Sequence, residues 1–77
     1  MNIDLSRKIQ EISSIFSAYG DNFIVNINGF QVLATLKDKF YEVDIMKNYN
    51  IIKSWNIKEE DIVYFLIYFN NKTKVEK

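Results

Sequence analysis

Cysteine, histidine and proline are absent from the sequence, and glycine occurs only twice among its 77 residues. Without cysteine and histidine the chain cannot form a disulfide framework, a thiolate nucleophile, an imidazole base or a zinc finger. The side chains left for chemistry are carboxylates, lysines, tyrosines and serines, which support only magnesium-carboxylate or carboxyl-pair mechanisms. We therefore predict that the protein is not an enzyme, holds no cofactor or metal, and has no small-molecule substrate.

An excess of charge of one sign and long apolar runs are also lacking. Ten basic and ten acidic side chains balance at neutral pH, and Arg7 is the only arginine. A neutral chain produces little long-range field toward phosphate backbones, which disfavours a nucleic-acid partner. The longest apolar run, residues 62–69, is shorter than the roughly 20 residues that cross a bilayer, and charges interrupt the beginning of the chain, where a signal peptide would need an apolar core. We expect a cytoplasmic protein without a membrane partner.

The residues that are present favour one packed domain over residues 1–77. Hydrophobic residues make up 48% of the chain and aromatic residues 16%, which is typical of a globular core. A helix is predicted over residues 4–19, because apolar residues recur there at helical spacing. These residues are Leu5, Ile9, Ile12, Phe16 and Tyr19. Gly20 is suited to the left-handed conformation that often ends a helix.

Three antiparallel strands are predicted to follow over residues 22–46. Asn28-Gly29 is a preferred pair for a two-residue type I′ hairpin turn, and a second turn is predicted at Asp38-Lys39. The first turn pairs residue 27 with 30, 25 with 32 and 23 with 34, and the second pairs 36 with 41, 34 with 43 and 32 with 45. Both registers place apolar residues opposite apolar residues on one face, which supports the meander.

Helical structure is predicted again after residue 46. Asn48 and Asn50 resemble turn or cap residues, and residues 51–55 are expected to form a short helical turn. Asn56 and Glu59 fit a capping box before a terminal helix over residues 57–70. A buried strand over residues 62–69 is the alternative, because that run is rich in β-branched and aromatic residues. The predicted fold is thus α+β and two-layered, with an N-terminal helix, a three-stranded antiparallel meander and one or two C-terminal helices.

Candidate functional residues are apolar groups that this fold would leave exposed. If residues 62–69 are helical, the helix is apolar on every side, so we expect part of it to meet a partner. Tyrosine and tryptophan tolerate partial exposure and are frequent at interfaces. The candidates here are Trp55, Tyr64 and Tyr68. A second candidate patch, on the otherwise polar face of the meander, holds Ile24, Leu33 and Phe40.

Two acidic groups admit competing interpretations. Glu42 and Asp44 lie two apart on one predicted strand and so share a face, where they could bind a metal or be the solvated side of the sheet. Glu59, Glu60 and Asp61 begin the predicted terminal helix, where negative charge is favourable. Neither group is a metal-binding motif, so both are expected to be structural.

In size and element order the chain resembles the small proteins that phages and mobile elements encode to inhibit host machinery, including anti-CRISPR proteins. The resemblance implies a non-enzymatic protein-binding module that acts by occluding a protein surface. Its partner would be another protein, or a second copy in a homodimer. The alternative is a small nucleic-acid-associated regulator that uses the basic tail, with Lys72, Lys74 and Lys77 joined by Lys53 or Lys58.

Overall fold

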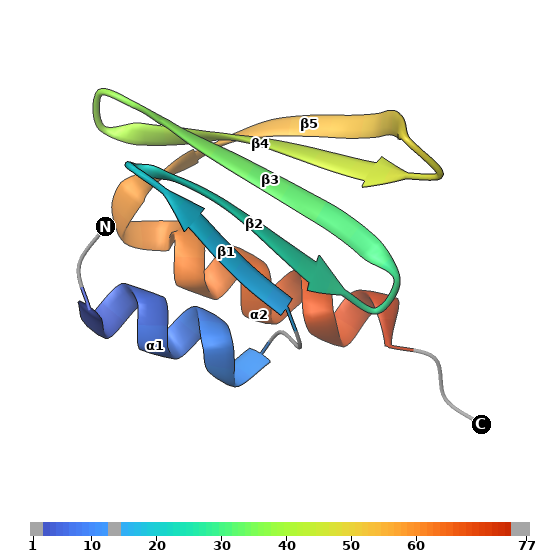
Figure 1. Cartoon of the computed structure of the whole chain (residues 1–77). Coiled ribbons are helices and arrows are strands. Elements are labelled where there is room, and N and C mark those ends of the chain that lie inside the picture. Colours follow the sequence, from blue (N-terminus) through green and yellow to red (C-terminus); the bar gives the residue numbers. More distant parts are fainter. Residues whose placement is uncertain (1–2, 13–14, 75–77) are drawn as a thin grey trace.

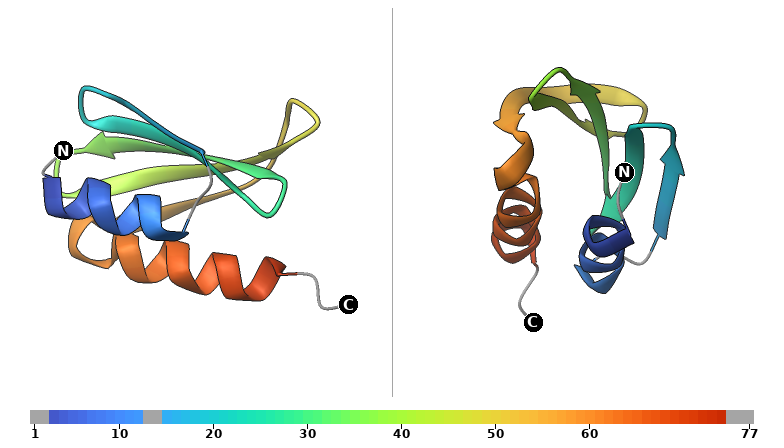
Figure 2. Two further views of the ribbon diagram at one scale, coloured as in Figure 1. Left: turned by 60° about the horizontal axis from the view of Figure 1, so that its bottom comes forward. Right: turned by 90° about the vertical axis from the view of Figure 1, so that its left-hand side faces the viewer.

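The structure is a computed structural model of the chain, and it describes residues 3–12 and 15–74. Its elements are, in order, α1 (Ile3–Ile12), β1 (Ile15–Tyr19), β2 (Asn22–Ile27), β3 (Phe30–Lys37), β4 (Phe40–Lys47), β5 (Asn50–Lys58), η1 (Glu59–Asp61) and α2 (Ile62–Thr73). The strands form one five-stranded antiparallel sheet whose spatial order follows the sequence (Figure 1). Both helices lie on the same face of the curved sheet (Figure 2). The described chain therefore has two layers, helices on sheet.

The two central hairpins have the predicted turns and registers. Asn28 and Gly29 both have positive φ, 52° and 88°, as a type I′ turn requires. The confirmed pairs are Phe23 with Ala34, Val25 with Val32, Ile27 with Phe30, Val32 with Ile45, Ala34 with Val43 and Leu36 with Tyr41. A one-residue slip would turn these apolar side chains to solvent, so burial of one face determines the register.

The predicted helix over residues 4–19 is wrong in its second half. Helix α1 ends at Ile12, and Ile15–Tyr19 is strand β1, which pairs with β2 through a turn at Gly20. Gly20, with φ of 62°, therefore belongs to a hairpin and does not end a helix. Isoleucine, phenylalanine and tyrosine favour strands, and pairing with β2 satisfies a full ladder of backbone hydrogen bonds. Residues 13–14 of the predicted helix lie outside the described residues.

The predicted helical turn at residues 51–55 is also wrong, and with it the three-stranded sheet. These residues belong to β5, the longest strand, which pairs with β4 and carries a register shift opposite Ile45 and Met46. The capping box is absent because Asn56 lies within β5, opposite Glu42. Neither η1 nor α2 begins with a side-chain cap. Pairing of residues 50–58 with the edge of β4 outweighs their local helical pattern. With β1 on the other side, the sheet therefore has five strands.

Residues 62–69 are helical, and the strand alternative is wrong. Helix α2 spans Ile62–Thr73, later than the predicted range of 57–70, and the three acidic residues of η1 directly precede it. Asn28 Nδ2, in the β2–β3 turn, donates hydrogen bonds to the Asn70 carbonyl oxygen (2.9 Å) and to Thr73 Oγ1 (3.0 Å). The turn thus satisfies acceptors in the last turn of α2. No helix within residues 3–12 and 15–74 is long and apolar enough to cross a membrane.

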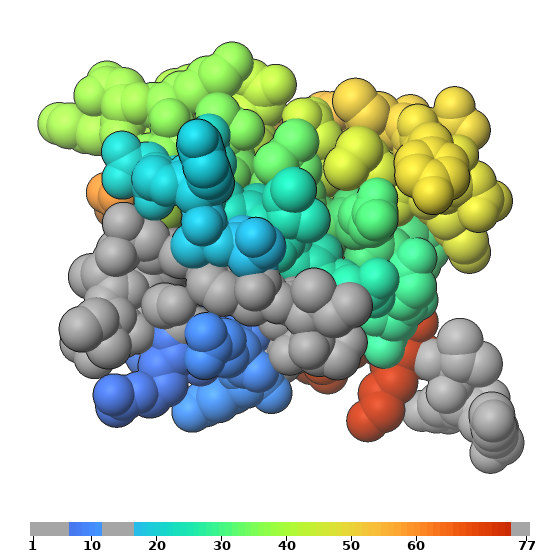
Figure 3. Space-filling model, viewed as in Figure 1, coloured from blue at the N-terminus to red at the C-terminus, as the bar shows by residue number. Residues whose placement is uncertain are grey.

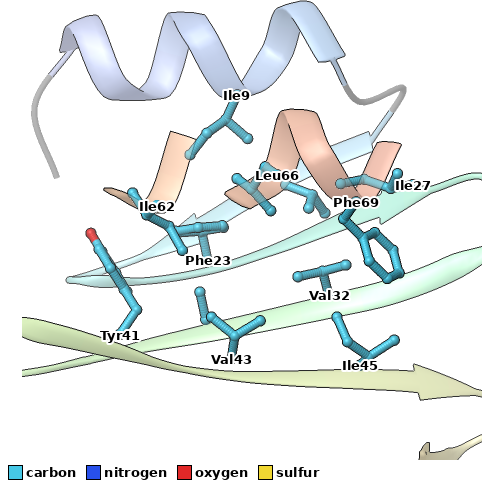
Figure 4. Close-up of a cluster of buried hydrophobic side chains, with 12 residues drawn as sticks. Ile9, Phe23, Ile27, Val32, Tyr41, Val43, Ile45, Ile62, Leu66 and Phe69 are labelled. Carbon is cyan, nitrogen blue, oxygen red and sulfur yellow. The ribbon is translucent and has the colours of Figure 1, made fainter. Parts of the chain in front are cut away.

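The core lies between the sheet and the two helices. Alternate residues of the three middle strands point toward the helices, and Ile9 of α1 together with Ile62, Leu66 and Phe69 of α2 points back at them (Figure 4). Phe23 and Tyr41 meet edge to face, with ring centroids 5.5 Å apart. One face of the sheet and one side of each helix therefore share a single apolar cluster, and the other sides of α2 are left for other contacts.

Candidate protein-binding surface

Tyr64 and Tyr68 stand on the side of α2 that faces away from the core. Ile62, Leu66 and Phe69 take the buried side, whereas Tyr64 is 71% exposed and Tyr68 58% exposed. Four residues separate the two tyrosines, so their side chains lie on one helix face, one turn apart. Neither α1 nor β5 covers this face. The structure thus places both predicted residues together on an exposed aromatic ridge.

Open grooves border this ridge on both sides. The groove toward β5, of about 520 Å³, has three lining residues on the strand and three on the helix. The strand residues are Asn56, Ile57 and Lys58, and the helix residues are Tyr64, Phe65 and Tyr68. The groove toward α1, of about 400 Å³, is lined by Lys8, Glu11, Glu60, Val63, Tyr64 and Ile67. Tyr64 contributes to both grooves, so it is the central side chain of the exposed helix face.

Trp55 forms part of the packing beneath the ridge. It pairs with Val43 on the helix-facing side of the sheet and is partly buried. Its ring centroid lies 5.3 Å from that of Phe65, and Lys53 Nζ lies 5.0 Å from the Trp55 centroid. Trp55 therefore supports Phe65 from behind, and it does not stand out as a contact residue of its own.

The outer edge of β5 is free of any strand among the described residues. The Glu59 N–H donates a hydrogen bond to the Lys39 carbonyl oxygen at 3.0 Å, so the backbone groups of residue 59 point toward β4. Because this direction alternates along an antiparallel strand, Trp55 and Ile57 bond to β4. The N–H and C=O groups of Ser54, Asn56 and Lys58 then point outward at the sheet edge. A row of unpaired donors and acceptors is a template for a further strand.

The second predicted patch is only partly assembled. Ile24 and Leu33 are direct neighbours in the β2–β3 register, as predicted. Phe40 lies opposite Lys37 and Lys58 at the far end of β4, four residues from Asp44, the neighbour of Leu33. Four residues of strand span about 13 Å, so Phe40 does not join the other two. Single exposed apolar residues of this kind are normal on protein surfaces.

The tip of the β4–β5 hairpin was missed by the sequence reasoning. Tyr49 is 96% exposed with φ of 66°, and Ile51 and Ile52 nearby are also exposed. Figure 3 shows this yellow turn at the margin of the molecule, away from the helices. Trp55 and Ile57 alternate with the polar residues Ser54, Asn56 and Lys58, which is a strand signal for the second half of β5.

The two carboxylates in the middle of β4, Glu42 and Asp44, each have a local partner. Lys37 bonds to Glu42, and this hydrogen bond, reinforced by the charge of Glu42, raises the pKa of Lys37. The Ser54 hydroxyl donates to Asp44 at 2.7 Å. No group of three or more potential metal ligands occurs among the described residues. Glu42 and Asp44 lie on the polar outer face of the sheet, opposite Asn56 and Ser54.

Tyr41 in the core and Lys72, one of the lysines of the predicted nucleic-acid site, also have identified neighbours. Burial, with smaller contributions from the charges of Glu59 and Asp21, raises the pKa of Tyr41. Lys72 Nζ lies 5.7 Å from the Tyr68 ring centroid. Lys77, at the end of the basic tail, lies outside the described residues. The ridge therefore carries a cation at its C-terminal end.

No family model, curated protein or solved structure matches this chain. Its function must therefore be argued from the surfaces described above. The β5–α2 flank, defined as the outer edge of β5 with Tyr64, Phe65 and Tyr68 of α2, combines aromatic side chains, a groove and an unpaired strand edge.

Proposed function

We propose that the chain is a non-enzymatic protein-binding module and that the β5–α2 flank is its contact surface. The observation that carries the proposal is the exposure of Tyr64 and Tyr68 beside an open groove on an otherwise apolar helix. Tyrosine supplies a large rigid contact area and a polar hydroxyl, which is why it is frequent among the residues that dominate binding. A module of this kind inhibits its partner by covering a surface of it.

The charge of the chain is consistent with occlusion of a protein surface and not with imitation of a nucleic acid. Ten positive and ten negative side chains give no net charge, whereas mimicry of a phosphate backbone needs a strongly acidic surface. The resemblance to phage-encoded inhibitors rests on size and on an element order that includes a three-stranded sheet. Because the sheet has five strands, the proposal stands on the surface alone, and the anti-CRISPR relationship stays a prediction.

An affinity pull-down from lysate of the source cell, with and without nuclease, tests this function. The tagged wild-type chain should retain a protein partner after nuclease treatment. The double variant Tyr64→Ala, Tyr68→Ala should lose that partner. Tyr19→Ala is the matched control, because Tyr19 is also highly exposed but lies on β1, at the other edge of the sheet.

Two results would contradict the proposal. Loss of the captured material on nuclease treatment, with retention that falls steeply as salt rises, would favour the nucleic-acid alternative. Equal capture by the wild type and the double variant, with loss in the Tyr19→Ala chain, would move the contact surface away from α2.

A further inference from the structure

The groove between β5 and α2 opens at the free edge of the strand. Asn56 and Lys58 line it together with Ile57, although Asn56 and Lys58 belong to the polar outer face and Ile57 to the helix-facing side. Residues from the two faces of a strand can line the same groove where the groove reaches the backbone at the edge of the sheet. A polypeptide entering the groove therefore meets the outward N–H and C=O groups of β5 and the rings of α2 at the same time.

From this geometry we infer that the β5–α2 flank binds an extended segment of a partner protein, which adds to β5 as a sixth, antiparallel strand. The inference rests on the proposed function and names its partner chemistry. An added strand lies about 4.8 Å from β5 and bonds to its exposed backbone groups. Its residues alternate between the two faces, so every second side chain passes over Phe65, Tyr64 and Tyr68. Those side chains must be apolar.

Charge on the outer face of β5 favours an acidic residue opposite Lys58. Between Asn50 and Lys58 the only charged side chains are Lys53 and Lys58. Lys58 shares the outer face with Ser54 and Asn56, whereas Lys53 lies opposite Ile45 on the helix-facing side, over the ring of Trp55. Cross-strand pairs of opposite charge are favourable, and like charges directly opposite are not. Asp61 lies past the end of β5, at the margin of the groove. The partner segment therefore alternates apolar residues with polar ones and carries an acidic residue opposite Lys58.

The same charges argue against a second copy of this chain at the edge. In two β5 strands paired with each other, Lys58 of one copy would face Ser54, Asn56 or Lys58 of the other, and none of these is a carboxylate. An acidic residue of a different protein neutralises Lys58, whereas a copy of β5 offers it no carboxylate. The occupant of the flank is thus a partner strand and not a homodimer mate.

Short peptides of alternating aspartate and valine test the inference on the folded full chain. We expect the aspartate peptide to slow hydrogen exchange of the Ser54 and Lys58 amides, whereas the Trp55 and Ile57 amides, already bonded to β4, stay unchanged. A lysine-valine peptide of the same length should bind about 3- to 10-fold more weakly, because it places like charges beside β5. Equal affinity for both peptides would refute the charge argument.

Methylation of peptide nitrogens separates strand addition from simple apolar contact. Paired residues of antiparallel strands share a face, so the peptide N–H groups that bond to β5 belong to the aspartates. N-methylation of the aspartates should abolish binding, whereas N-methylation of the valines should leave it within a few-fold. If both methylated peptides bind like the parent peptide, no strand is added.

Asn56→Pro tests the edge from the protein side, with Asn56→Ala as its control. The N–H of residue 56 points outward, so proline removes a donor at the edge and leaves the β4–β5 ladder in place. The proline variant should lose the peptide, whereas the alanine variant, which removes only the side chain and keeps the N–H, should bind it much more tightly than the proline variant does. Unchanged binding by a folded Asn56→Pro chain refutes strand addition. Should this variant fail to fold, the methylated peptides decide the question on the wild type.

Two further results distinguish this inference from the proposed function. A natural partner that Asn56→Pro retains, and that the Tyr64→Ala, Tyr68→Ala variant loses, would refute strand addition and leave the binding module intact. A dimer in sedimentation that Asn56→Pro dissociates would overturn the acidic partner and place a second copy at the edge.

Discussion

Replacement of Leu66 by alanine is expected to lower the free energy of unfolding by about 3 kcal/mol. Leu66 is fully buried on the core side of α2, and the substitution removes three carbon atoms, worth about 0.8 kcal/mol each, and leaves a cavity that adds to the loss. A chain of this length has a total stability of about 4 to 12 kcal/mol. The substitution therefore removes between a quarter and most of it.

Tyr64→Ala is the matched comparison two residues earlier on the same helix. Tyr64 is 71% exposed, and alanine is the better helix former, so the expected change is within about 0.5 kcal/mol of zero. Urea unfolding followed by the fluorescence of Trp55, the only tryptophan, and by circular dichroism measures both variants. With a slope of about 1 kcal/mol per molar urea, Leu66→Ala should shift the midpoint down by about 3 M.

The result that would refute this reasoning is a similar loss in the two variants. It would mean that α2 is rotated about its axis and that Tyr64 belongs to the core. A loss below about 1 kcal/mol for Leu66→Ala would show that the space around Leu66 collapses or was never closely packed. Coincident transitions by the two probes are needed for either conclusion, because the free energies assume two-state unfolding.

Two further predictions concern the β4–β5 turn and the buried phenol. Tyr49→Gly should raise the free energy of unfolding by about 0.5 to 1 kcal/mol. The left-handed conformation at φ of 66° costs a tyrosine about 1 to 2 kcal/mol, and it costs glycine only part of that, in entropy. Thermal unfolding measures the change, and a lower midpoint in the variant would show that the tyrosine ring contributes packing. Tyr41 has a raised pKa in the fold, so the stability of the protein should hold below pH 10.0, the ordinary pKa of tyrosine, and fall as the pH rises above it. Urea midpoints measured against pH should show a smaller alkaline loss for Tyr41→Phe than for the wild type. Identical pH dependence in the two proteins would contradict the raised pKa of Tyr41.

The sequence predicted those parts of the fold in which local and long-range preferences agree. Asn28-Gly29 is both a good turn and the point where two apolar strand faces come into register, and the helix at residues 62–69 is both long enough and next to an acidic start. Residues 15–19 have a helical spacing that continues from α1, but their side chains favour strands. There the pairing with β2 decided the outcome, and no local pattern reports on a distant partner strand.

Strand β5 was missed for a different reason. Its turn, Asn48-Tyr49, places a bulky residue in the left-handed region, so it lacks the glycine that usually marks a hairpin. For the candidate site, the sequence predicted Tyr64 and Tyr68 because an apolar run cannot be covered on all sides. It could not predict the free edge beside them, because an edge exists only once the order of the strands is known.

The sheet order also determines how the chain folds. Each strand pairs with its neighbour in the sequence across a two-residue turn, and hairpins of this kind form within about 1 to 10 μs. The docking of α1 beside α2 instead joins opposite ends of the described chain, so its loop closure comes at a higher entropic cost. The sheet can therefore assemble before its helices cover it. Until they dock, the apolar faces of Val25, Val32 and Val43 are open to other chains, and yields on refolding should fall as the protein concentration rises.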